Sequence, residues 1–520
     1  MIITKIWNSI FKKYKLSREE KSFIEENKKY WHKNNNNIGI IIEGFLQSPT
    51  SVIEKARIAK AIEAKLNISS LVLLRGFSQK SSNVIDIYKS FSISHYVMWW
   101  AQYLNLYLFI KIFIKTIYIF NRCSNGEKLL RLKFDDIVIG DLIYDTLIRF
   151  NPKSYTVGKL NYKQHFRHIF RAYYSAELYK KLFLKYNIKA VVTSHNVYSE
   201  YGILCRLGYK YNADIFLKDM DVFKHYDHSI DVNEHFLKVD KIVYSNVLSD
   251  LEVIKSAEKY LESRFDGSAN QIDVKNAYRD KITYTKDSLF DFFKIRNNSN
   301  KNIFILAHAF SDAPHVGEGI LFKDYYSWLV ETMKVITKVD GVNIFVKPHP
   351  SSYMWNENGA VEEILTKLNI SNIYVIPNDF NTNSIKDIAD CILTAQGTAG
   401  LEFSCFGIPA ITVGKGYYSG FGIATEPSTK EEYFTLLNNI IKINKLPEHT
   451  QQEAKLLLYL SFQHLTRSEI LPKDHIFPGD NFDLKFKEQY EEVSLKLKNG
   501  VPIKDNFYDY IYKISKNNDI

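Results

Sequence analysis

Short apolar runs alternate with longer amphipathic stretches along most of this 520-residue chain. The apolar runs are bounded by Gly, Pro or polar residues, which is typical of buried strands. Strands that alternate with helix-length segments predict parallel sheets with crossover helices. The first series of strands is expected at 38–42, 71–74, 190–193 and 214–217. The second is expected at 303–306, 343–346, 373–376, 391–394 and 409–413.

The two series predict an α/β protein with two Rossmann-like domains that face a cleft, and with helical extensions at both ends. We expect four parts: an N-terminal helical arm at 1–37, a first domain at 38–285, a second domain at 286–450 and a C-terminal helical extension at 451–520. The last helices are expected to pack back against the first domain. Ser51 and Glu54 have the spacing of a capping box and predict the start of a helix.

A basic segment follows one strand of the second series. The run 343–346 ends in Lys347-Pro348-His349-Pro350. The two prolines end the strand and leave Lys347 and His349 at its carboxyl end, where open α/β sheets bind ligands. His349 can donate a hydrogen bond or a positive charge to a phosphate, although a loop histidine that bonds a carbonyl is the alternative.

A second segment, Gln396-Gly397-Thr398-Ala399-Gly400-Leu401-Glu402, follows the strand at 391–394. Its glycines allow a close approach of the backbone, and Thr398 is a natural N-cap for a helix expected at 398–406. Free amides at a helix start suit a phosphate, and Glu402 can accept hydrogen bonds from ribose hydroxyls. Interaction of Glu402 with the helix N-terminus is the competing interpretation. Two phosphate-facing segments on one sheet predict a nucleotide site.

Several ionisable residues follow the expected strand ends and are candidates for acid or base catalysis. After 303–306 come His308, Asp312 and His315, for which acid/base work or phosphate contact is favoured over a metal site. In the first half, Glu43, Asp141, Asp145 and Glu200 have comparable positions. We take Asp312, His315, Glu200 and Glu43 as the catalytic candidates, and a structural role for each remains open.

Composition excludes several classes of protein. The formal charge of +10 is modest, and no Lys/Arg-rich block with interleaved aromatic residues occurs, so nucleic acid is not an expected partner. The four cysteines lack CxxC spacing, which argues against a zinc site or a disulfide framework. No P-loop, GxGxxG or GxSxG motif is present. We expect no cofactor and no bound metal.

Two segments bear on membranes. Residues 1–16 have the pattern of a basic amphipathic helix, and 90–110 carry no charged residue but include Trp99 and Trp100. Neither resembles a signal peptide or a clear transmembrane span, and 90–110 is expected to be a buried or interfacial helix. We expect a cytoplasmic protein with peripheral contact at the inner face of the cytoplasmic membrane. Packing of both segments within the first domain is the alternative.

The segments 310–315, 324–329, 347–350 and 396–402 together resemble bacterial capsule and surface-polysaccharide biosynthesis proteins. These are GT-B glycosyltransferases related to the Kdo transferases of capsule assembly. The likeness is strong from about 300 to 425, thinner from about 38 to 220, and includes 139–145 and 194–198. It is absent at both ends of the chain.

The resemblance implies metal-independent transfer of a sugar from a nucleotide-sugar donor, held by the second domain, to a surface polysaccharide or lipid-linked glycan. The pair His349-Pro350 resembles the HP motif of enzymes that use cytidine-nucleotide donors, and Thr398 stands near the donor phosphate in related enzymes. Donor contacts are expected from a set of residues at the two segments, Lys347, His349, Gln396, Gly397, Thr398, Ala399, Gly400 and Glu402. Three alternatives remain open: a CDP-alcohol polyol-phosphate transferase, a sugar-nucleotide epimerase and a non-catalytic GT-B scaffold.

Overall fold

The computed structural model describes residues 15–32, 37–75, 84–99, 105–151, 153–219, 222–269, 271–296, 299–317, 319–462, 468–472, 476 and 480–515. The chain forms two compact units. Unit 1 comprises Met1–Ile143, Lys159–Asn233 and Leu465–Ile520, and unit 2 comprises Tyr144–Gly158 and Glu234–His464. The helix expected at 1–16 lies largely outside the described residues. The cleft expected between the two domains stays a prediction.

Unit 1 is built on a six-stranded sheet with the strand order β3-β2-β1-β6-β7-β8. Its strands are β1 (Ile38–Glu43), β2 (Ser69–Leu74), β3 (His95–Met98), β6 (Ala190–Thr193), β7 (Asp214–Asp219) and β8 (Val222–Tyr226). Neighbouring strands are parallel except β7 and β8, which are antiparallel. This confirms the parallel α/β sheet predicted for the first half of the chain.

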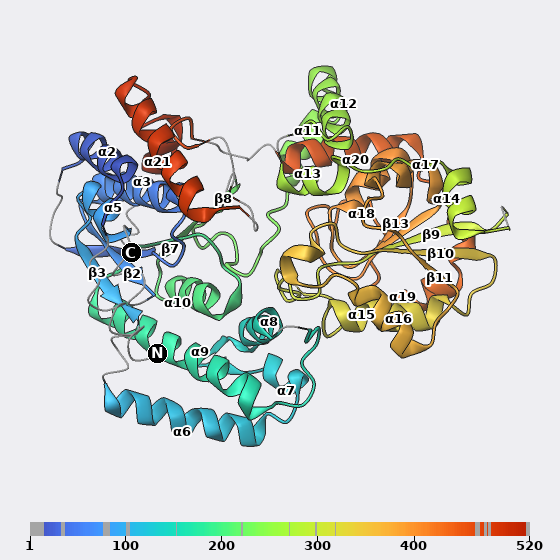
Figure 1. Cartoon of the computed structure of the whole chain (residues 1–520), viewed down its shortest axis with the longest axis horizontal. Helices are drawn as coiled ribbons and strands as arrows, with labels where there is room; N and C mark the ends of the chain where they lie inside the picture. Colours follow the sequence, from blue (N-terminus) through green and yellow to red (C-terminus); the bar gives the residue numbers. More distant parts are fainter. Residues whose placement is uncertain are drawn as a thin grey trace. The chain divides into compact units, whose positions relative to one another are not determined.

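Helices cover both faces of this sheet (Figure 1). One face carries α2 (Arg18–Asn27), α3 (Pro49–Leu66), α5 (Val84–Ser90) and α21 (Phe482–Lys498), and the other carries α9 (Tyr162–Lys185) and α10 (Ile203–Lys210). Helix α22 (Asn506–Ile514) contacts α3. Beyond α9 lie α6 (Leu106–Arg122), α7 (Gly126–Leu130) and the small ribbon of β4 (Lys133–Phe134) and β5 (Ile137–Val138). Coverage on both sides explains why the strands are apolar runs rather than alternating ones.

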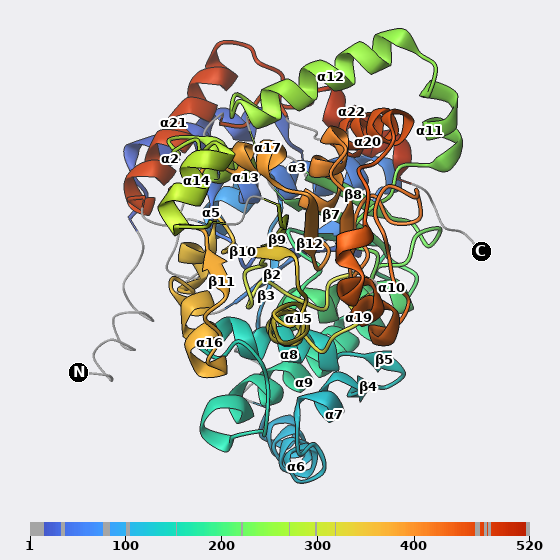
Figure 2. The ribbon, with the colours of Figure 1, turned by 90° about the vertical axis from the view of Figure 1, so that its right-hand side faces the viewer.

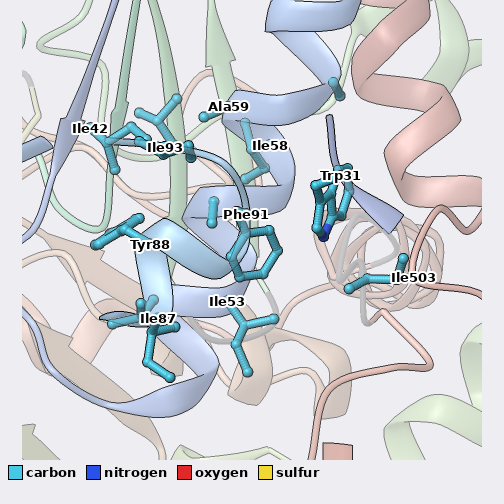
Figure 3. Close-up of a cluster of buried hydrophobic side chains, with 14 of the residues drawn as sticks. Trp31, Ile42, Ile53, Ile58, Ala59, Ile87, Tyr88, Phe91, Ile93 and Ile503 are labelled. Carbon is cyan, nitrogen blue, oxygen red and sulfur yellow. The ribbon is translucent and has the colours of Figure 1, made fainter. Parts of the chain in front are cut away.

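The core of unit 1 gathers apolar side chains from the strands, α3 and α5 (Figure 3). Ile42 of β1, Ile53 and Ile58 of α3, and Phe91 after α5 are almost fully buried there. The prediction of a capping box at Ser51 and Glu54 is wrong. Helix α3 begins earlier, with Ser48 at the N-cap and Pro49 in the first turn, where its missing N–H costs nothing.

Helices α21 and α22 complete unit 1, as expected of the C-terminal helices, whereas α20 (Glu448–Ser461), in the expected extension at 451–520, belongs to unit 2 and contacts α12 (Leu251–Phe265). Tyr490 of α21 lies 5.4 Å from Phe23 of α2, measured between ring centroids. The buried Arg57 guanidinium on α3 contacts the Asp505 carboxylate at 2.5 Å and donates to the Ile503 carbonyl at 2.8 Å. The last helices are therefore part of the first core rather than a separate extension.

The sequence predicts one helix for the uncharged segment at 90–110, and this prediction is wrong. It contains the edge strand β3, and α6 begins at Leu106. Trp99 is buried, and its Nε1 donates a hydrogen bond of 2.9 Å to the Ser175 hydroxyl of α9. None of the described helices is long and apolar enough to cross a membrane.

Unit 2 holds a five-stranded sheet, entirely parallel, with the order β11-β10-β9-β12-β13. Its strands are β9 (Lys301–Leu306), β10 (Val342–Lys347), β11 (Ile373–Val375), β12 (Cys391–Thr394) and β13 (Ala410–Thr412). Consecutive residues of β9 enter opposite cores, with Ile303 and Ile305 on one face and Phe304 on the other. The second series of predicted strands is confirmed.

Two helical layers enclose this second sheet (Figures 1 and 2). One layer is α15 (Tyr325–Ile336), α16 (Ala360–Leu368) and α19 (Lys430–Asn438). The other comprises α12 (Leu251–Phe265), α13 (Ile272–Tyr278), α14 (Lys286–Phe293), α17 (Ile385–Ile388), α18 (Ala399–Glu402) and α20 (Glu448–Ser461), with α11 (Lys241–Val247) beside α20. Short 3₁₀ turns occur at Ser352–Trp355, Thr382–Ser384, Phe403–Phe406 and Ile440–Lys442.

The chain passes from unit 1 to unit 2 at Asn233 and Glu234, whereas the sequence placed the boundary near residue 285. The physical reason is the apolar side of the helices that follow. Leu261 and Phe265 of α12 and Phe290 of α14 are buried in the core of the second sheet. The polar, helical segment between the two predicted sheets has no local feature that shows which of the two cores its helices pack against.

One short segment of the first half also belongs to unit 2. Helix α8 (Gly140–Phe150) begins in unit 1, and Tyr144–Gly158 is assigned to unit 2. The Tyr144 hydroxyl donates to the carboxylate of Asp324, which caps the start of α15. Tyr155 packs against Phe310, with 5.1 Å between ring centroids. No local sequence pattern predicts this exchange, because its contacts join residues far apart in the chain.

Candidate functional site

A pocket in unit 2 lies where β9, β10 and β12 end at the carboxyl edge of the sheet. Its lining includes His308 after β9, Lys347 at the end of β10 and Thr394 at the end of β12. Arg264 and Tyr278, from α12 and α13, complete one wall. In parallel α/β sheets this edge is where ligands bind, so the position agrees with the predicted nucleotide site.

Lys347 is the most unusual group in this pocket. The side chain is 8 % exposed, and no acceptor of a hydrogen bond or ion pair is found for its ammonium among the described residues. Burial, reinforced by the nearby Lys281 charge, lowers the pKa of Lys347 to about 7. A buried cation without a counter-ion is destabilising, so an anionic ligand in the pocket would supply what the protein does not.

Two histidines flank this lysine. The Nε2 atom of His308 accepts the Gln396 N–H at 3.3 Å and lies 3.2 Å from the Thr394 hydroxyl. Burial and the neighbouring His349 lower the pKa of His308 to about 3, so this ring is neutral. The Nδ1 atom of His349 accepts the Ser351 N–H at 3.2 Å, which assigns the proton of a neutral ring to Nε2. A neutral His349 ring of this tautomer carries its N–H donor at Nε2.

The small-residue segment after β12 also contributes to the lining of the pocket. Gly397, Thr398 and Ala399 line it. Thr398 is the N-cap residue of α18, but its hydroxyl makes no capping hydrogen bond. Helix α18 is only four residues long and continues as the 3₁₀ turn Phe403–Phe406, so its dipole is weaker than the predicted longer helix would provide.

Two members of the predicted donor set lie behind the pocket wall. The Gln396 amide donates to the Tyr325 hydroxyl at 2.6 Å. A Cβ on Gly400 would come within 2.4 Å of the Tyr418 hydroxyl, which itself donates to the Gly397 carbonyl at 2.9 Å. Packing against Tyr418, rather than approach of a ligand, therefore requires glycine at position 400.

Glu402 lines the pocket and is held by a partner that sequence reasoning missed. Its Oε1 accepts from the buried Arg264 guanidinium at 2.6 and 3.0 Å, and its Oε2 accepts from the Tyr278 hydroxyl at 3.3 Å. The carboxylate is therefore fixed in position, with Oε2 the less strongly engaged oxygen. Arg264 is 138 residues away in sequence, so no motif could reveal this pair.

His315 is tied into the structure at both ring nitrogens. Its Nδ1 lies 2.6 Å from the Asp145 carboxylate, and its Nε2 lies 2.7 Å from the Lys323 carbonyl. These two acceptors suit a doubly protonated ring that fastens the 144–158 segment to the loop after β9. Such a ring must break a contact before it exchanges a proton, which favours a structural role.

Asp312 is exposed in the same loop and is not part of the pocket lining. The loop is held from below by Glu357, whose buried carboxylate accepts the N–H groups of Phe310 and Ser311 at 2.7 and 2.8 Å. Burial raises the pKa of Glu357, although these hydrogen bonds oppose the effect. Glu357 was not among the predicted residues; it precedes α16, and nothing in its local sequence distinguishes it.

Glu43, at the end of β1 in unit 1, is fully buried and paired. Its carboxylate contacts the Lys55 ammonium at 2.8 Å and accepts from the Ser194 hydroxyl at 2.6 Å and the Leu46 N–H at 3.3 Å. Burial alone would raise the pKa of Glu43, but the Lys55 charge and the hydrogen bonds outweigh it and hold the pKa below its usual value. This environment favours a permanently ionised structural carboxylate over a catalytic base.

Glu200 lies in a π-helical turn, Tyr198–Gly202, after β6. Its carboxylate bridges two arginines, Arg75 at 2.5 Å and Arg171 at 2.7 Å. The structure therefore places Glu43 and Glu200 in unit 1, and Asp312 and His315 in unit 2. In the described part of the chain, no group of three or more His, Cys, Asp or Glu side chains is suited to hold a metal ion.

Several solved structures are similar to this chain in part. The KpsC β-Kdo 2,4-transferase of Thermosulfurimonas dismutans is 12 % identical over 53 % of this chain and 85 % of its own, with a TM-score of 0.31. A Rickettsia africae glycosyltransferase is 10 % identical over 90 % and 100 %, with a TM-score of 0.26. A Methanocaldococcus jannaschii UDP-GlcNAc 2-epimerase, solved with UDP-GlcNAc and UDP, is 12 % identical over 80 % and 97 %, with a TM-score of 0.27. Likenesses this low do not transfer an activity from one protein to another.

Sequence comparison gives a more specific result. No curated protein matches the chain. Residues 194–439 match the family described as capsule polysaccharide biosynthesis protein. This span includes all the described residues of the unit 2 pocket, and it confirms the likeness predicted from the four sequence segments. Residues 194–439 therefore carry the sequence pattern of the capsule polysaccharide biosynthesis protein family.

Proposed function

We propose that this protein is a glycosyltransferase that moves a sugar from a nucleotide-sugar donor to an acceptor in capsule polysaccharide assembly. The observation that carries the proposal is the buried Lys347 ammonium, for which no anionic partner is found among the described residues, in a pocket at the carboxyl edge of a parallel sheet. The phosphate of a nucleotide sugar would supply that partner. The family match over 194–439 supports the same class of reaction.

The other pocket groups have complementary roles in this proposal. His349 Nε2–H donates to a phosphate oxygen, and the Thr398 hydroxyl, which makes no capping bond, contacts the same group. Glu402, fixed by Arg264, accepts from a ribose hydroxyl through Oε2. Because Lys347 offsets the negative charge of the leaving nucleotide, we propose that transfer is independent of metal.

The finer assignments follow the sequence motifs. The His349-Pro350 pair favours a CMP-linked donor, and the acceptor would be a surface polysaccharide or a lipid-linked glycan. Asp312, which is exposed after β9, is our candidate for the base that activates the acceptor hydroxyl, and His315, Glu200 and Glu43 are the other candidates. A lipid-linked acceptor would place the protein on the inner face of the cytoplasmic membrane.

The test has two stages on the full chain. Isothermal titration with CMP, CDP, UDP and GDP measures whether a nucleotide binds, and incubation with matching nucleotide sugars and lipid-linked acceptors, followed by mass spectrometry, measures transfer. Binding of a nucleotide followed by gain of one sugar mass on the acceptor is the expected result. Transfer of an alcohol phosphate from a CDP-alcohol would favour the polyol-phosphate alternative, and no binding of any nucleotide would favour a scaffold.

A further inference from the structure

Helix α6 of unit 1 exposes an extended apolar surface. The helix packs on α9 through its inner side, which includes the buried residues Leu108, Ile112 and Ile119 (Figure 1). The α6 outer face consists of the large apolar residues on the opposite side, Leu106, Tyr107, Ile110, Ile114, Ile117 and Tyr118. Tyr107 is 79 % exposed, Leu106 69 % and Ile114 61 %.

These residues form one continuous stripe rather than scattered exposures. At 100° per residue, Leu106, Ile110, Ile114 and Ile117 fall on adjacent positions of the helix surface. Single exposed apolar residues are normal on a protein, whereas a contiguous apolar patch marks a surface that binds something. Helix α6 is apolar on both sides but packed on only one of them, so its exposed side is expected to bind a partner or a surface.

The charges of α6 indicate what the outer face binds. The helix contains no acidic residue, and its three basic residues, Lys111, Lys115 and Arg122, lie along one side of it. Lys111 is half exposed and pairs with Glu177 of α9 at 2.9 Å, and the Lys115 ammonium lies 4.5 Å from the centroid of the Tyr173 ring of α9. Tyr107 and Tyr118 lie between this basic side and the apolar stripe, and Arg122 stacks over Tyr118 at 4.6 Å from the ring centroid. An apolar stripe bordered by tyrosines and then by cations matches the layers of an anionic membrane surface, from acyl chains through the interface to phosphate headgroups.

We propose that the α6 outer face docks on an anionic phospholipid surface, with the helix lying in the plane of the interface. This inference rests on the proposed function, because a lipid-linked acceptor is what would require the contact. The helix has 17 residues, about 26 Å at 1.5 Å per residue, and no described helix meets the length and hydropathy of a membrane span. The buried Trp99 is not part of this surface, so the docking element lies after the tryptophan-bearing segment.

Vesicle flotation of the full chain tests the proposal with a matched pair of variants. The first carries Ile110→Ser, Ile114→Ser and Ile117→Ser on α6. The control carries Leu184→Ser, Leu484→Ser and Leu495→Ser, three apolar residues of unit 1 that are also exposed but lie on α9 and α21. With phosphatidylglycerol-rich vesicles at low salt, we expect the wild type and the control to float, and at least a tenfold smaller floating fraction for the α6 variant.

Further conditions separate the competing outcomes. Flotation should weaken at high salt and with pure phosphatidylcholine vesicles, because the basic side of α6 then loses its attraction. Equal flotation of the α6 variant and the wild type, or no flotation of the wild type at low salt, overturns the proposal. Loss of a wild-type dimer in the α6 variant, without flotation, would assign the face to a second copy of the chain. Nucleotide titration of the same variants keeps failure of docking distinct from failure of the proposed function.

Discussion

The two sheets differ in how charged side chains are paired at the edge where their parallel strands end. In unit 1, the buried Glu43 carboxylate after β1 contacts the Lys55 ammonium at 2.8 Å, and Glu200 after β6 bridges Arg75 and Arg171. In unit 2, Lys347 at the end of β10 is 8 % exposed, yet no acceptor is found for it within the described residues. At the unit 1 edge each of these carboxylates is paired with a cation, whereas the Lys347 amine, whose pKa burial lowers to about 7, has no counter-ion among the described residues.

This contrast distinguishes residues that hold the fold from residues that hold a ligand. In a buried ion pair the two side chains compensate each other's charge without a ligand, so such residues are structural even at a strand end. A buried cation without a partner lowers stability and persists where a ligand supplies the missing charge. Position at the carboxyl edge therefore identifies the candidates, and the state of pairing decides between them.

The largest effect on stability is expected from removing one charge of the buried Glu43–Lys55 ion pair in unit 1. Glu43→Gln leaves the Lys55 ammonium buried without its counter-ion, so we expect the free energy of unfolding to fall by about 3–5 kcal/mol. Urea denaturation followed by circular dichroism measures the change. If Glu43 were instead a catalytic base, the variant would lose turnover at nearly unchanged stability.

The double variant Glu43→Gln, Lys55→Met is the control for this prediction. It removes both charges, so it should be more stable than Glu43→Gln alone. A double variant as unstable as the single one would show that the loss arises from the Ser194 and Leu46 hydrogen bonds rather than from the ion pair.

Much of the fold could be predicted because its strands are short apolar runs bounded by turn residues. Strands β6 and β12 agree with the predicted 190–193 and 391–394. Prediction failed where a local signal was ambiguous. The uncharged run around β3 fits helix or strand equally well. Helix α3 begins at Ser48 and Pro49, before the predicted cap at Ser51.

The candidate site was predictable only in part, for a different reason. Lys347 and His349 follow a strand directly, so sequence order places them at the ligand edge. Their surroundings depend on contacts across the chain, such as the Arg264 pair with Glu402 and the Asp145 pair with His315, which span 138 and 170 residues. Whether an ionisable group is already paired is a tertiary property, and that property separates Glu43 from Lys347.

The second prediction concerns the charged edge of unit 2. Lys347→Met removes the buried cation, so we expect nucleotide affinity to fall by about 1.5–3 kcal/mol, the value of a hydrogen bond to a charged group. Stability should hold or rise, in contrast to Glu43→Gln, because a buried unpaired charge is lost. Titration calorimetry and urea denaturation measure the two quantities.

Lys334→Met is the matched control, since Lys334 is an exposed lysine on α15 of the same unit. It should change neither affinity nor stability by more than about 0.5 kcal/mol. If Lys347→Met lowers stability and leaves affinity unchanged, Lys347 is a structural residue and the contrast between the two edges does not hold.

The smallest effect is expected from pH, and it tests the same lysine without a mutation. The pKa of Lys347 is about 7, against an ordinary value of 10.5. Phosphate binds the protonated form, so affinity for a nucleotide sugar should fall by up to about tenfold between pH 6 and pH 8.

Stability of the ligand-free protein should change in the opposite direction. Between pH 7 and 10 the unfolded chain binds the Lys347 proton more tightly than the folded chain does, so the free energy of unfolding rises with pH. Both dependences should flatten in Lys347→Met, measured by calorimetry and urea denaturation across this range. An affinity that stays constant from pH 6 to pH 8 in the wild type would separate Lys347 from the donor phosphate.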